Sequence, residues 1–258
     1  MTEKITNIFD SHSHYDDKWF DEDRFELIKS QLNNNVFAIM HAATDLESSE
    51  FGIKTAGEID RFYTSVGIHP SEIDKLPDDW RERLEVLATN PLVKAIGEIG
   101  MDYHYEGYDK QKQIEVFEFQ LELAKRLNLP VIVHIRDCTE DCMEILKKHK
   151  PRGVVHCFSG SAETAAEVLA LGMYISFTGA LTFKGAKRAA KAIAVVPFDR
   201  LLLETDCPYM TPEPIRPGRC QSDMIEFTAR KAAEIKGIEV QQLVDLCTEN
   251  TIRLFNIG

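Results

Sequence analysis

The sequence contains no apolar run near the roughly 20 residues that a membrane-spanning helix needs, so we expect no membrane segment. Its first residues lack the apolar core of a signal peptide, and this favours a cytoplasmic location. Low-complexity segments, linkers and shifts of composition are also missing. A chain of 258 residues without an internal boundary is therefore expected to form one domain over residues 1–258.

Positive charge is scarce, because 30 Lys and Arg residues stand against 42 Asp and Glu residues, for a net charge of −12. This balance argues against a basic stripe that grips duplex nucleic acid along its length. It does not exclude a nucleic-acid substrate, because divalent metal ions supply positive charge where a phosphate binds. Any contact with nucleic acid is expected to be local.

The six cysteines do not form a complete zinc motif. Cys138 and Cys142 lie four residues apart and can share one face of a helix, but no second Cys or His pair with matching spacing accompanies them. In a reducing compartment we expect free thiols rather than a disulfide framework.

Short apolar runs rich in Val, Ile and Leu alternate with amphipathic segments along the whole chain. The expected strands are residues 5–10, 36–40, 62–66, 92–96, 131–133, 153–155, 173–177 and 201–203. The expected helices are residues 21–33, 48–59, 78–88, 110–127, 140–148, 162–171, 184–194, 223–236 and 241–255. About eight βα units predict an α/β fold of the TIM (β/α)8 barrel type. An open doubly wound sheet also alternates strands and helices, and it is the alternative.

Residues that metals favour follow six of the eight expected strands. They are His12, His14, His69, Glu98, His134, His156 and Asp206. In a barrel of parallel strands the carboxyl ends converge on one face, where the chemistry takes place. An open sheet would gather ligands at one switch point instead. The distribution favours the barrel and a metal-dependent hydrolase.

Four of these residues, from three of the expected strands, suggest how metal ions are held. His12 and His14 lie two apart in an extended segment, so their rings share one face, and Asp10 is a candidate for orienting one of them. Glu98 lies between glycines at a strand end, and its two oxygens allow it to bridge two ions. Asp206 follows the eighth strand, which lies beside the first in a closed ring.

Two further polar residues at this face suggest phosphate binding. His69 precedes a proline, and we interpret it as a phosphate ligand rather than a metal ligand. Arg136 can form a forked pair with a phosphate. A salt bridge from Arg136 to Asp137 or Glu140 is an equally weighted alternative. His41 and Glu204 are interpreted as supporting residues.

Six segments resemble the TatD-type metal-dependent deoxyribonucleases, in order and over essentially the whole chain. They are residues 8–14, 67–70, 97–102, 129–137, 156–160 and 203–209. The resemblance implies two divalent ions, Mg²⁺, Mn²⁺ or Zn²⁺. One ion would be held by His12, His14, Glu98 and Asp206, and the other by Glu98, His134 and His156.

The resemblance further implies a 3′–5′ exonuclease on single-stranded or frayed DNA, with Asp206 and Glu98 as catalytic residues and Asp206 as general base. His69, Arg136 and Arg216 would contact the substrate. The family commonly carries Asn-x-Pro near the position of Arg216, and this chain does not, which bears on substrate preference. Tyr103, Phe158 and Phe183 are aromatic residues for base stacking or for the core.

Two other functions remain open from the residues. The same metal pair can hydrolyse a small ester, lactone or cyclic amide. A non-catalytic binding protein with a vestigial site is the second alternative, and the intact set of metal-favouring residues argues against it.

Overall fold

Eight parallel strands form one sheet in chain order in the computed structural model, which describes residues 4–258. The strands are β1 (Ile8–Ser13), β2 (Val36–His41), β3 (Phe62–Val66), β4 (Val93–Asp102), β5 (Val131–Arg136), β6 (Gly153–Val155), β7 (Tyr174–Phe177) and β8 (Leu201–Leu203). The sheet curls round so that Ser13 at the end of β1 bridges Cys207 just after β8. The predicted barrel is confirmed, and the open-sheet alternative is wrong.

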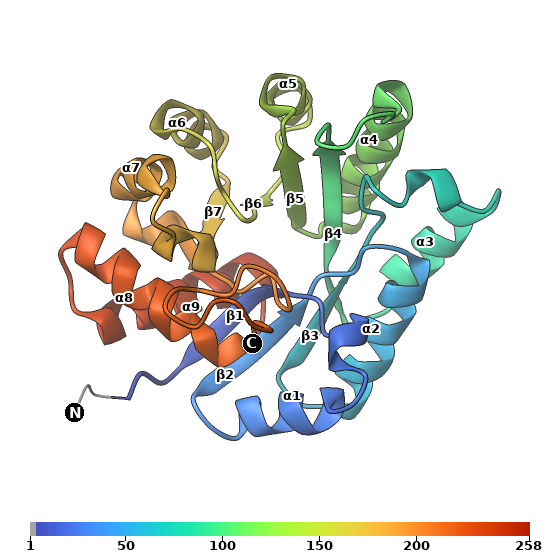
Figure 1. Cartoon of the computed structure of the whole chain (residues 1–258). Helices are drawn as coiled ribbons and strands as arrows, with labels where there is room; N and C mark the ends of the chain where they lie inside the picture. Colours follow the sequence, from blue (N-terminus) through green and yellow to red (C-terminus); the bar gives the residue numbers. More distant parts are fainter. Residues whose placement is uncertain (1–3) are drawn as a thin grey trace.

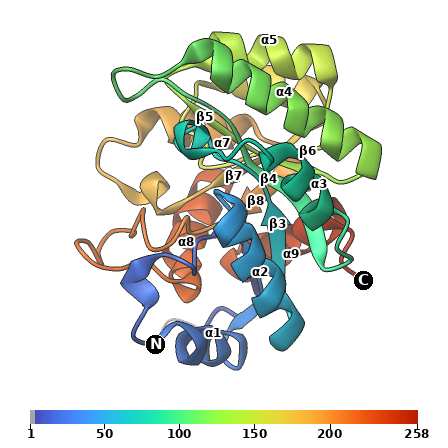
Figure 2. The same cartoon turned by 90° about the vertical axis from the view of Figure 1, so that its right-hand side faces the viewer.

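The helices surround the strands, as Figure 1 and the turned view in Figure 2 show. They are α1 (Arg24–Leu32), α2 (Leu46–Glu58), α3 (Trp80–Ala88), α4 (Lys110–Leu127), α5 (Thr139–His149), α6 (Ala162–Ala170), α7 (Lys187–Val195), α8 (Ile225–Lys236) and α9 (Val240–Phe255). Within residues 4–258, no helix is both long and apolar enough to span a bilayer.

The barrel interior has an apolar lower part, toward the amino ends of the strands. Side chains from all eight strands pack there with Leu254 and Phe255 of α9, which packs against β1 and β8. Ile132 of β5 and Val154 of β6 belong to this layer. Residues two apart on a strand point to the same side, so the histidines two positions further on also face the interior. This alternation places predicted site residues directly above the apolar layer.

Several strands run further than expected, and this moves site residues into the sheet. β4 continues to Asp102 instead of ending at residue 96, and β5 continues to Arg136 instead of ending at residue 133. Glu98 therefore lies inside a strand and not after it. The sequence pattern ends these strands early because glycines and charged residues interrupt the apolar run of β4, and His134 and Arg136 interrupt that of β5. Other polar side chains inside the barrel mouth satisfy Glu98 and His134.

The helix from Lys110 to Leu127 has the predicted bounds, because both of its ends carry local signals. The Asp109 side chain accepts a hydrogen bond from the Lys112 backbone N–H, and Asn128 ends the helix in the left-handed conformation. The first predicted helix is shorter than expected and begins at Arg24.

His41 at the end of β2 is fully buried, and its Nε2 lies 3.2 Å from the Ser48 carbonyl. Burial lowers its pKa to about 4. The unfolded chain binds a proton here below about pH 6.5, whereas the folded chain does so only near pH 4. This contribution to stability is complete above pH 6.5 and is lost as the pH falls toward 4.

We therefore expect the free energy of unfolding of the wild type to fall by about 2 kcal/mol more than that of His41→Gln between pH 6.5 and pH 5. The glutamine amide can still donate to Ser48, but it does not titrate. Urea denaturation at the two pH values measures the difference. An equal decrease in both proteins would contradict the assignment.

Candidate metal centre

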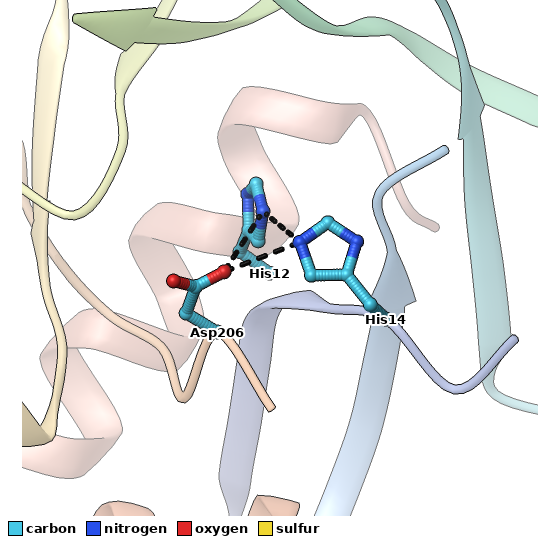
Figure 3. Close-up of side chains that lie close together, drawn as sticks. All are labelled: His12, His14 and Asp206. Carbon is cyan, nitrogen blue, oxygen red and sulfur yellow. Dashed lines mark hydrogen bonds and ion pairs between the residues drawn. The ribbon is translucent and has the colours of Figure 1, made fainter. Parts of the chain in front are cut away.

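Four side chains converge at the carboxyl end of β1, as Figure 3 shows for three of them. The Nε2 atoms of His12 and His14 lie 3.1 Å apart. Asp206 Oδ1 lies 3.6 Å from His12 Nε2 and 3.2 Å from His14 Nε2. Glu98 Oε2 reaches the same two nitrogens from β4, at 3.2 and 3.5 Å. The structure thus brings these four predicted residues together.

The spacing of these donor atoms fits one divalent ion. Ligands at about 2.0–2.2 Å from a tetrahedral ion lie about 3.3–3.6 Å from one another, close to the separations seen here. Two imidazole nitrogens that face each other also make a poor hydrogen bond if both are unprotonated or both carry a proton. A shared cation would instead accept a lone pair from each nitrogen.

A second group lies on the other side of the Glu98 carboxylate. Glu98 Oε1 lies 2.9 Å from His134 Nδ1 and 2.7 Å from His156 Nε2. The same two nitrogens are 3.2 Å apart. One carboxylate therefore faces both groups, with one oxygen turned toward each.

Hydrogen bonds on the far side of the rings orient two of the histidines. His14 Nδ1 lies 2.8 Å from the Ala42 carbonyl, which can only accept, so Nδ1 carries a proton, and Nε2 presents a lone pair to the site whenever the ring is neutral. His134 Nε2 lies 3.2 Å from Asp102 Oδ2 and can donate to it, which leaves Nδ1 for the site.

Two buried acids hold the strands that carry the site. Asp10 accepts hydrogen bonds from the backbone N–H and hydroxyl of Thr205 at 3.0 and 2.6 Å, and from the Ser222 hydroxyl at 2.7 Å. It meets only the backbone of His12, so the prediction that it orients a ring is wrong. It ties β1 to the segment after β8. Glu204 accepts from the Ser176 hydroxyl and lies 3.5 Å from His156 Nδ1.

The acidic groups make the centre attractive to cations. Burial alone would raise the pKa of Glu98, but the surrounding histidines, His156 foremost, hold that pKa well below its usual range. Burial lowers the pKa of His14, yet its hydrogen bond to Asp206 and the charge of Glu98 raise it to about 9. The same field that draws protons to the rings draws a divalent cation.

The centre opens into a cavity of about 670 Å³, which His69 and Arg136 line and Arg216 does not. His69 Nε2 lies 3.5 Å from Glu98 Oε1. The Arg136 guanidinium lies over the Tyr105 ring, 5.4 Å from its centroid, and forms no ion pair within residues 4–258. The alternative salt bridge from Arg136 to Asp137 or Glu140 is thus wrong. The Arg216 guanidinium lies 4.0 Å from the centroid of Phe183, and its predicted contact with substrate stays a prediction.

Among the residues of the cavity wall that the sequence did not point to, two bear on binding. Asp102 ends β4 and faces His134, and its place four residues after Glu98 at a strand end was an available signal. Tyr105 lies in the loop after β4 and is 66% exposed, and nothing in the local pattern separates it from its neighbours. Of the predicted stacking residues, Phe158 lines the cavity but is largely buried.

A family model described as TatD related DNase matches residues 9–256. The uncharacterized metal-dependent hydrolase YabD of Bacillus subtilis is 37% identical over 254 residues, which covers 97% of this chain and 100% of YabD. The uncharacterized metal-dependent hydrolase YcfH of Escherichia coli is also 37% identical, over 256 residues, with 97% and 96% covered.

The crystal structure of YJJV, a TatD homologue from Escherichia coli, superimposes with a TM-score of 0.91 at 29% identity and covers 97% of this chain and 98% of that one. The barrel and the cluster of His, Glu and Asp side chains define a metal-dependent hydrolase. The chain belongs to the TatD related DNase family.

We expect a divalent metal to stabilise the folded protein through Glu98. After chelation, adding Zn²⁺ or Mn²⁺ at about 100 times its dissociation constant should raise the melting temperature by about 5–10 °C. Glu98→Ala should abolish this rise, because the carboxylate faces both histidine groups. Differential scanning calorimetry measures the shift.

Glu118→Ala is the matched control, since Glu118 also lies 3.2 Å from a histidine nitrogen, on α4 away from the cavity. This variant should keep the full response to metal. A Glu98→Ala protein that gains as much from metal as the wild type would remove Glu98 from the binding site.

Proposed function

We propose that this protein is a two-metal nuclease that removes nucleotides from the 3′ end of single-stranded or frayed DNA. The observation that carries the proposal is the Glu98 carboxylate, whose two oxygens face two separate groups of metal-favouring side chains. His12, His14 and Asp206 would complete one site, and His134 and His156 the other. Family membership supports nucleic acid as substrate, and the polarity follows the family resemblance.

Two bound divalent ions would supply the charge that neutralises the scissile phosphate and would lower the pKa of an attacking water. The residues provide the rest. Asp206 Oδ1 faces the two histidines, and its other oxygen points away from them (Figure 3). That second oxygen is available to accept a proton from the attacking water, which is the role of a general base.

His69 is suited to donate a hydrogen bond to a phosphate oxygen. Its Nδ1 accepts from the backbone N–H of Ser71 at 3.1 Å, so in the neutral ring the proton is on Nε2. Burial lowers its pKa to about 3, which keeps the ring neutral. The Nε2 proton then lies on the side of the centre, where Glu98 Oε1 is 3.5 Å away, and it can donate to a phosphate oxygen bound there. The ring also lies in a group with Asp102 and His134 whose donor atoms could hold a metal ion, and we favour the phosphate role because the two proposed metal sites are complete without His69.

The cavity favours a flexible chain end over a rigid duplex. It lies at the barrel mouth beneath the loops that follow the strands. Its lining combines the polar centre with apolar side chains, among them Phe158, Phe177 and Leu181. The apolar side chains suit a sugar or a base, whereas the polar centre suits the phosphate. A threaded single strand can satisfy both.

Asp206→Asn keeps the shape of the side chain and removes the base. We expect kcat to fall by about 10²- to 10⁴-fold while the metal content stays at two ions per chain. Steady-state rates and elemental analysis of the same preparation measure both quantities. A variant with two bound ions and nearly full kcat would show that Asp206 is not the base.

The reaction itself is tested with oligonucleotides labelled at the 5′ end, in Mg²⁺ or Mn²⁺ and with EDTA as control. A ladder of products that shorten stepwise from the 3′ end is expected, and EDTA should abolish it. Duplex of the same sequence should be cut more slowly than single strands.

Internal cuts, release from the 5′ end, or no cleavage with any divalent metal would contradict the proposal. In the last case, hydrolysis of a lactone or a small carboxylic ester by the metal-loaded protein would identify the small-molecule alternative. Glu98→Ala serves as the inactive control in both assays.

A further inference from the structure

The loop between β4 and α4 carries Tyr105, whose aromatic ring is not packed into the core of the protein. Tyr105 is 66% exposed and lines the cavity. Its hydroxyl makes no hydrogen bond within the described part of the chain, and its ring meets only His104, edge-on at 5.0 Å, and the Arg136 guanidinium. A large exposed aromatic side chain at the rim of a cavity is a typical binding group.

The neighbouring residues fix this loop without using Tyr105. Tyr103 donates a hydrogen bond to Asp141 Oδ2 at 2.7 Å, and its ring is stacked on Tyr108 at 4.2 Å and 6°. His104 Nδ1 lies 2.8 Å from Asp137 Oδ2. Two of the three tyrosines thus hold the loop in place, and the third is left on the cavity side.

Arg136 completes the arrangement from β5. Among the residues lining the cavity, within the part of the chain the structure describes, it is the only Lys or Arg. Its guanidinium forms no ion pair there, although its charge acts on the nearby Asp102 carboxylate, and it lies over the Tyr105 ring. A guanidinium in this position can fork to a phosphate while the ring beside it remains free to stack.

We propose that Tyr105 and Arg136 form a nucleotide subsite, in which the Tyr105 ring stacks on a base and Arg136 binds the phosphate next to it. The subsite lies on the His134 side of the centre, because β5 carries His134 and Arg136 while β4 ends at Asp102 and its following loop carries Tyr105. This inference rests on the proposed nuclease function and assigns a place to one base of its substrate. Stacking tolerates every base, so the subsite selects a single strand and not a sequence.

The test is a double-mutant cycle in which a change in the protein is combined with a change in the DNA. Tyr105→Ala should raise KM for a single-stranded oligonucleotide about 5- to 150-fold, the range for loss of one base–aromatic stack, with a smaller change in kcat. Tyr105→Phe and Tyr105→Trp should keep the wild-type KM, because they keep a ring. Trp19→Ala is the control, since Trp19 is an exposed aromatic residue that does not line the cavity.

The DNA half of the cycle replaces one nucleotide at a time, from the 3′ end, with an abasic nucleotide. At one position, the abasic nucleotide should raise the KM of the wild type by the same factor as the Tyr105→Ala substitution does. The KM of Tyr105→Ala should not rise further when the abasic nucleotide is at that position. A loss of stability or of loop order would weaken binding of every substrate equally and would not reproduce this coupling.

The outcomes separate the two proposals. Two results would overturn the subsite and leave the nuclease proposal intact, provided that the wild type cleaves the oligonucleotide. One is an unchanged KM in Tyr105→Ala. The other is an increase in KM from the abasic nucleotide that adds to the increase from Tyr105→Ala at every position. An equal loss in Trp19→Ala also overturns the subsite. If the wild type cleaves no oligonucleotide, the proposed function fails, and the subsite fails with it.

Discussion

The shared carboxylate of Glu98 is the constraint on which the rest of the site depends. It is 3% exposed, and its oxygens lie within 3.6 Å of five histidine nitrogens from four strands or the loops that follow them. An ionised group so deeply buried is costly unless positive charge surrounds it. The histidines supply part of this charge, and a cation supplies more. Removing the carboxylate would leave the two histidine groups with nothing between them.

The barrel makes this arrangement possible because it separates packing from chemistry. The lower interior is filled with apolar side chains from the strands and is sealed by α9, so the polar layer above it has a rigid floor. The join between β1 and β8 is held by Asp10, Thr205 and Ser222 rather than by a long strand pairing. His12 and Asp206 sit on either side of that join, where the Asp206 backbone N–H donates to the His12 carbonyl at 2.9 Å, and the Asp10 network reinforces this direct link.

Sequence alone was sufficient for the barrel and for the gathering of the predicted metal-favouring residues. Alternating strands and helices place the carboxyl ends of all strands at one face of the barrel. A histidine at such an end therefore faces the same cavity as the others. The partners of Arg136 were not predictable in the same way. Asp137 and Glu140 are close in sequence, yet Tyr105, some 30 residues earlier, takes the contact because β4 and β5 are neighbours. The ends of β4 and β5 were also predicted too early. Polar residues were taken to mark the ends of these strands, but here they stay in the sheet because other polar side chains, rather than water, satisfy them.

The charge distribution gives a reason for the way a substrate would enter. Asp16, Asp17 and Glu72 line the cavity together with Arg136, so the approach is acidic and the overall charge is −12. A polyanion is repelled by such a surface except where cations bind, and a long duplex would meet that repulsion along its whole length. A chain end exposes few phosphates to it and places one of them at the centre. For the proposed nuclease, the same repulsion would help a shortened strand to leave, because the strand would keep few contacts after losing its terminal nucleotide.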